Sequence, residues 1–142
     1  MKRKYIIAVL LTITVIFLLN YLLSYRTISF KDITGVTIEN ADKIMIGDKI
    51  IYDNFEGIIS FFASYEYKRL HNNSFDFQEE FPNGLRTYLV FIYLNNGEVI
   101  FINPMKNRVI INNRLYKVNK EMDHDFLIDI YESISEDNII EN

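Results

Sequence analysis

A run of 21 uncharged residues, 5–25, constrains the organisation of this chain more than any other feature. As an α-helix it would be about 31 Å long, which matches the roughly 30 Å hydrocarbon core of a bilayer. Tyr5, Tyr21 and Tyr25 lie near its ends, where the amphipathic ring favours the headgroup layer. The run therefore predicts a transmembrane helix in the lipid bilayer, and about 110 residues remain for one folded domain.

The flanks of this run favour an uncleaved signal anchor over a cleaved signal peptide. A cleaved peptide has a shorter apolar core of roughly 7–15 residues and a small-x-small cleavage site, whereas bulky Leu22, Leu23 and Tyr25 end this longer run. Residues 1–4 are a basic tip, which the positive-inside rule keeps in the cytoplasm. We expect a single-pass protein of the cell membrane, with the N-terminus inside and the C-terminal domain outside.

Charge and cysteine content exclude several classes of partner and site. From Arg26 onward there are 12 bases against 19 acids, and this acidic part shows no basic stripe in the sequence, so we expect no nucleic-acid partner. The absence of cysteine removes disulfides, thiolate metal sites and thiol catalysis. The 23 Ile and 15 Asn against three Ala indicate a low-GC bacterial source.

The apolar periodicity predicts an α+β domain in the order strand, strand, helix, four strands, helix, with an antiparallel sheet and two amphipathic helices packed on it. Residues 26–40 are assigned to a juxtamembrane linker or a short first strand over 33–38. Residues 41–136 are assigned to the extracytoplasmic domain, and 137–142 to a frayed tail.

Turn and cap signals give the boundaries in the first half of this domain. Gly47 and Asp48 separate two short apolar runs and predict a hairpin over 43–52. Asp53 fits a helix N-cap, and the helical spacing after it predicts a helix over 54–70.

Four apolar runs in the second half predict an antiparallel meander. These are 86–95, 98–103, 108–111 and 114–118. The first run is apolar on both faces, which predicts a central strand covered on each side. Asn96-Gly97 predicts a type I′ turn and Asn112-Asn113 a second tight turn. Asn119 fits the N-cap of the final helix.

The triplet Asp123-His124-Asp125 is the densest group of potential metal ligands. Successive residues of a helix point about 100° apart, so the three cannot converge on one ion. We interpret them as a solvated first helical turn, where acids suit the helix dipole. His71 is interpreted as a residue at a helix C-terminus. No catalytic, cofactor or metal residue is predicted.

The polar loop 71–85 combines acids with phenylalanines. Paired carboxylates can perform acid-base chemistry, but such acids most often lie on a solvated loop. Loops carry function more often than cores do, so this loop is the candidate partner-binding edge. Its candidate residues are Phe75, Phe77, Glu79, Glu80 and Phe81.

After the basic start and apolar run come a short hairpin (KIMIGDKIIYD), an amphipathic segment (NFEGIISFFASY) and a meander that ends in IINNRLYKV. The arrangement resembles the small, uncharacterised signal-anchored extracytoplasmic proteins of low-GC Gram-positive bacteria. The resemblance covers most of the chain and rests on pattern. It implies a location and a fold, and no reaction.

Three functional hypotheses follow from the sequence. The first is a non-enzymatic, membrane-tethered extracytoplasmic domain that binds a protein, such as a membrane or envelope protein, or another envelope component. It would act as an accessory, immunity-type or regulatory module, without a small-molecule cofactor. The second is an envelope-acting hydrolase that uses Asp76, Glu79, Glu80 and His71. The third is a secreted protein released by signal cleavage.

Overall fold

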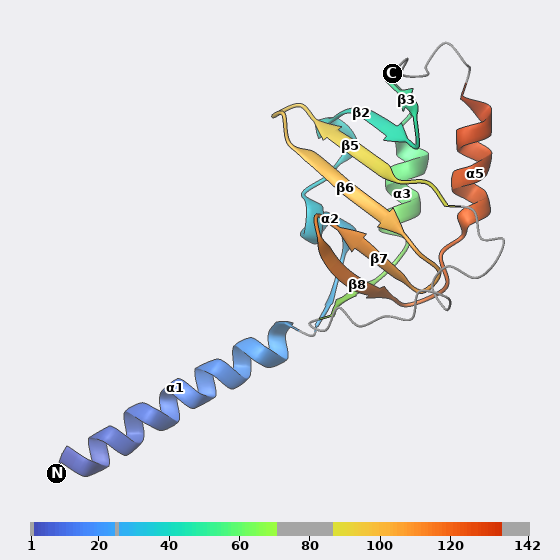
Figure 1. The fold of residues 1–142 in the computed structure, drawn as a ribbon. Coiled ribbons are helices and arrows are strands. Elements are labelled where there is room, and N and C mark those ends of the chain that lie inside the picture. Colours follow the sequence, from blue (N-terminus) through green and yellow to red (C-terminus); the bar gives the residue numbers. More distant parts are fainter. Residues whose placement is uncertain (1, 25, 71–86, 135–142) are drawn as a thin grey trace.

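The computed structural model describes residues 2–24, 26–70 and 87–134. It is an α+β structure in which a long N-terminal helix, α1 (Lys2–Ser24), projects from one end of a domain built on a single sheet (Figure 1). None of the apolar part of α1 is buried against the domain. The predicted helix and α+β class are therefore present in the structure.

Eight strands form one antiparallel sheet in the order β1-β4-β8-β7-β6-β5-β2-β3. The strands are β1 (Thr27–Ile28), β2 (Ala41–Ile46), β3 (Lys49–Ile51), β4 (Tyr67–Arg69), β5 (Val90–Leu94), β6 (Val99–Pro104), β7 (Arg108–Ile111) and β8 (Arg114–Val118). The predicted hairpin over 43–52 is confirmed by β2 and β3. The predicted meander is confirmed by the adjacent strands β5 to β8.

The hydrophobic core lies between one face of this sheet and the helices. These are α2 (Phe30–Thr34), the 3-10 turn η1 (Ile38–Asn40), α3 (Glu56–Ala63) and α5 (His124–Ser133). The ring of Phe62 is fully buried, stacks on Phe30 at 5.5 Å and meets Phe61 edge-on at 5.0 Å. Ile92, Ile102 and other alternate strand residues complete the core from the sheet side. The opposite face is covered by none of the described helices.

The predicted helix over 54–70 is wrong in its length and its cap. α3 ends at Ala63, Phe55 is its N-cap in place of Asp53, and Asn54 has a left-handed φ of 63°. Beyond Ser64 the chain alternates between buried and exposed residues and becomes β4, which pairs with β1 and β8. Pairing with these distant strands overrides the local helical pattern.

The predicted short strand over 33–38 is also wrong. Ser29 caps α2 by accepting from the Asp32 N–H at 3.1 Å, and Gly35 ends α2 with a left-handed φ of 70°. The strand in this region is β1, which precedes α2. Phe30 at the start of the helix and Val36, just beyond its C-cap, both lie in the core.

Two predictions about β5 need correction. Only Gly97 has positive φ in the β5–β6 turn, so the turn is not type I′; the Asn96 side chain accepts from the Glu98 N–H at 3.0 Å. β5 is central, but Phe91 and Tyr93 are only half-buried, so the strand is not covered equally on both sides. Both residues of the Asn112-Asn113 turn have positive φ, as expected.

The expected cap at Asn119 is wrong as well. Asp123 is the N-cap of α5 and accepts from the Phe126 N–H at 3.4 Å. The Asn119 side chain instead accepts from the Glu66 N–H at 3.1 Å, which continues the contact between β8 and β4. Asp125 is exposed, as expected for the first turn of this helix, and so are Asp129 and Glu132 farther along it.

Candidate functional site

The first candidate feature is α1 and its junction with the sheet. Residues Lys4–Leu23 are long and apolar enough to cross a bilayer, and the side-chain hydroxyls of Thr12 and Thr14 donate to backbone carbonyls at 3.0 and 2.9 Å. Only two residues separate α1 from β1. Three Cα steps of at most about 3.6 Å place Thr27 within about 11 Å of the end of the helix. The sheet therefore begins next to α1.

A row of basic side chains crosses the strands beside this junction. In register, Thr27 lies opposite Lys68, Lys68 opposite Lys117, and Lys117 opposite Arg108. Lys68, Lys117 and Arg108, which we term the basic row, share the sheet face away from the core. Within the described chain, neither lysine forms an ion pair. A shallow groove of about 290 Å³ is lined by Lys68 and Lys117 of this row and by Glu66.

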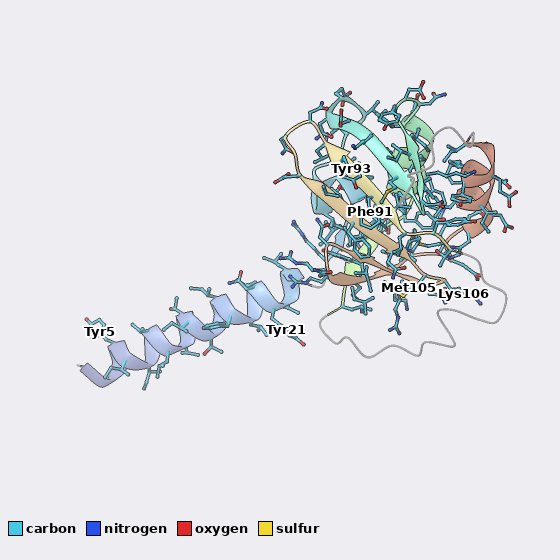
Figure 2. The ribbon with its side chains drawn as sticks, turned by 45° about the horizontal axis from the view of Figure 1, so that its top comes forward. Tyr5, Tyr21, Phe91, Tyr93, Met105 and Lys106 are labelled. Carbon is cyan, nitrogen blue, oxygen red and sulfur yellow. The ribbon has the colours of Figure 1, made fainter. Side chains whose placement is uncertain are left out.

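Farther from α1, the same face becomes apolar. Ile50 pairs with Met45, Met45 with Phe91, and Phe91 with Phe101. We term these four the apolar patch; all are half-buried, and the two phenylalanine rings lie 5.3 Å apart. Figure 2 shows Phe91 and neighbouring Tyr93 on this face. Aromatic residues and methionine are enriched in the cores of protein interfaces.

A larger cleft of about 710 Å³ lies between the end of β3 and helices α3 and α5. Its walls are mostly aliphatic or backbone, and Asp53 is the one carboxylate among the described residues that line it. Acid-base hydrolysis with two carboxylates needs a second such group on the opposite side of the bond that is cleaved. The described walls of this cleft do not provide that arrangement.

His124 does not lie on the solvated face that we expected. It is 7% exposed, and neither ring nitrogen has a hydrogen-bond partner among the described residues. Burial lowers the pKa of its imidazole, although the Met105 backbone and, more weakly, the carboxylates of Asp123, Glu121 and Asp125 act in the opposite direction. Asp123 and Asp125 remain exposed, and the described chain contains no group of three His, Asp or Glu side chains placed to hold one metal ion.

The tyrosines divide between structural and surface positions. Tyr67 is buried and donates its hydroxyl to the Phe62 carbonyl at 2.7 Å; burial raises its pKa. The hydroxyl of Tyr65 accepts from the Asp123 N–H at 3.0 Å, which ties the start of α5 to β4. Tyr93 is half-exposed beside the apolar patch, with the Lys43 ammonium 4.9 Å above its ring.

The sequence-predicted partner-binding residues Phe75, Phe77, Glu79, Glu80 and Phe81 lie outside the described residues, as do His71 and Asp76. Their partner-binding and catalytic roles stay predictions. The interpretation of His71 as a residue at a helix C-terminus is wrong, because α3 ends at Ala63 and the chain before His71 forms β4. The basic row and the apolar patch were not predicted from the sequence, because each consists of residues from separate strands. The alternation of residues along each strand could have shown that these side chains point outward, but not that they are neighbours.

No family model, curated protein or solved structure matches this chain.

Proposed function

We propose that this chain is a single-pass membrane protein whose extracytoplasmic domain is a non-enzymatic binding module for a protein partner of the same membrane or envelope. The observation that carries the proposal is α1, an unburied apolar helix joined to the edge of the sheet by two residues. Burying such a helix in a bilayer removes its apolar surface from water. The basic residues before it favour an inside N-terminus.

The apolar patch supports a protein partner. Its side chains are half-buried on a sheet face that no described helix covers, and exposed apolar patches commonly mark interaction sites. Confinement by α1 would raise the effective concentration of this face for a partner in the same membrane. The described cleft near β3, with its single carboxylate, gives no comparable support for an enzyme.

The absence of native cysteine allows one experiment to test both location and occupancy. Val99→Cys places a thiol beside the apolar patch at a residue that is 43% exposed, and Asn96→Cys places one in the exposed β5–β6 turn as a control. Both variants are treated with a membrane-impermeant maleimide in intact cells and after purification in mild detergent. We expect Asn96→Cys to react at similar rates in both settings, and Val99→Cys to react at least about tenfold more slowly in cells because the partner covers the patch.

Each departure from this result contradicts a different part of the proposal. Labelling of Asn96→Cys only after lysis would contradict the outside location. Equal rates for Val99→Cys in cells and in detergent would show an uncovered patch and contradict the bound partner. Protection that persists in the purified chain and disappears on dilution would assign the patch to a second copy of this chain. A shortened N-terminus on the native protein would favour the secreted alternative.

A further inference from the structure

The two lysines of the basic row are costly for the fold alone. Neighbouring strands lie about 4.8 Å apart, and Lys68 stands directly opposite Lys117. Arg108 has an interaction of its own, so the cost is argued from the lysine pair. Like charges placed directly opposite each other destabilise a strand pair. The cost falls when a group of opposite charge outside the sheet binds the row.

The position of the row restricts what that group can be. Thr27 pairs with Lys68, so the row starts one strand away from the end of α1. From the strand spacing, Lys68 lies about 5 Å from β1 and Lys117 about 10 Å. Thr27 is itself within about 11 Å of the end of α1, so Lys68 lies within about 16 Å of that end and Lys117 within about 21 Å. The Debye length is about 8 Å at physiological ionic strength, so a charged surface acts strongly on these lysines only when the domain rests on it.

The whole end of the domain near α1 shares this charge. Elements β1, α2, β4, β7 and β8 contain six bases and one acid, Asp32, although the domain is acidic in total. Elements β2, β3, α3 and α5 contain two bases and five acids. The bases near α1 are Lys31, Lys68, Arg69, Arg108, Arg114 and Lys117. Among these described elements the charge is therefore unevenly distributed, and the positive strands lie at the end of the sheet from which α1 projects (Figure 1).

We propose that the basic row binds the anionic phosphate headgroups of the bilayer that α1 crosses, so that the domain rests on the membrane by its β1-β4-β8-β7 end. This inference rests on the proposed membrane anchoring. Each Lys or Arg held near an anionic membrane surface strengthens binding by about fivefold. The negative charge of Glu66, which also lines the groove, weakens this attraction. The two lysines that line the same groove, Lys68 and Lys117, outnumber it.

The test uses the full chain reconstituted in vesicles, with a single fluorophore on a cysteine and an energy acceptor on the lipid headgroups. Asn113→Cys labels the turn between β7 and β8, and Asn96→Cys labels the turn between β5 and β6, which lies away from α1 in Figure 1. With 30% phosphatidylglycerol we expect higher transfer from position 113 than in pure phosphatidylcholine. The increase should vanish in 0.5 M salt and be much smaller from position 96.

Charge-matched variants distinguish lipid binding by the basic row from an effect of the net charge of the domain. Lys117→Gln and Lys43→Gln each remove one positive charge from an outward-facing strand residue, but Lys43 lies on β2, at the other end of the sheet. We expect Lys117→Gln to weaken the phosphatidylglycerol-dependent state about fivefold, Lys68→Gln with Lys117→Gln about 25-fold, and Lys43→Gln hardly at all. Circular dichroism of each variant checks the fold.

Equal transfer in the two lipids, or an equal effect of Lys43→Gln, would overturn the proposal. Retention of the chain by immobilised polyphosphate without any lipid dependence would assign the row to a soluble polyanion and also overturn it. These outcomes are independent of the maleimide experiment, because the vesicle assay starts from inserted protein. A domain found inside the cell would contradict the proposed function and leave headgroup binding measurable.

Discussion

At the scale of single residues, His124 has a defined energetic consequence. Its imidazole is buried without a hydrogen-bond partner in the described chain, and burial lowers its pKa. Above the ordinary histidine pKa of about 6.5, the folded and unfolded states are both neutral, and the residue adds no pH dependence. As the pH falls below that value, the unfolded state takes up a proton that the folded state does not, so the free energy of unfolding decreases until the folded-state pKa is reached.

We expect His124→Leu to reduce this loss of stability on acidification. One proton gives a slope of at most about 1.4 kcal/mol per pH unit, in the range just below pH 6.5. Urea unfolding of the full chain in mild detergent at pH 7.5 and pH 5.5 measures it, with His71→Gln as the control for the second histidine. An unchanged pH dependence in His124→Leu would contradict this assignment.

Gly47 is the second residue with a specific requirement. Its φ is +61°, and an added Cβ would lie 3.1 Å from Tyr88 and 3.2 Å from Tyr131, whose rings stack at 4.1 Å. Gly97 has a φ of +85° but open space around it. We expect Gly97→Ala to cost about 1–2 kcal/mol for the left-handed backbone alone, and Gly47→Ala to cost more because the rings must move. Equal losses of thermal stability in the two variants would show that the tyrosine contact is unimportant.

At the scale of elements, β4 shows where local sequence patterns stop being informative. Residues 65–69 continue an apolar spacing that also fits a helix, and only the pairing of β4 with β1 and β8 makes them a strand. The hairpin over 43–52 and the meander were predictable because turn-forming residues separate their strands in the local sequence. The basic row was not, because Lys68 and Lys117 become neighbours only through pairing between strands about 50 residues apart.

The cost of the row to the β4–β8 pair is measurable. Lys68→Glu places a carboxylate opposite Lys117, and we expect it to stabilise the domain by about 0.2–1 kcal/mol while it weakens the phosphatidylglycerol-dependent state by about 25-fold. Lys43→Glu on β2, which lies opposite Tyr93, is the control and should bring no gain. Thermal unfolding in uncharged detergent is the measurement. A destabilised Lys68→Glu variant would mean that the lysines do not repel each other appreciably.

At the scale of the whole molecule, the sequence predicts the class and the order of its main parts, while charge polarity emerges only from the sheet order. The net acidic charge argued against a nucleic-acid partner, yet the described elements β1, α2, β4, β7 and β8 contain six bases and one acid. Composition gives one net charge for the whole chain, whereas the tertiary structure determines where the positive and negative side chains lie. The partner-binding roles of the loop residues stay predictions, because these residues lie outside the described chain. They are Phe75, Phe77, Glu79, Glu80 and Phe81.

The short strand β1 also determines how the molecule responds to mechanical load. Two residue pairs, Thr27 with Lys68 and Ile28 with Tyr67, are all that join it to β4. Any tension between an anchored helix and a held domain passes through this two-residue ladder before it reaches the longer strands. β1 would therefore detach first and lengthen the connector from two residues to five, up to the start of α2 at Phe30, so that a pulled domain gains reach while β2 to β8 stay folded.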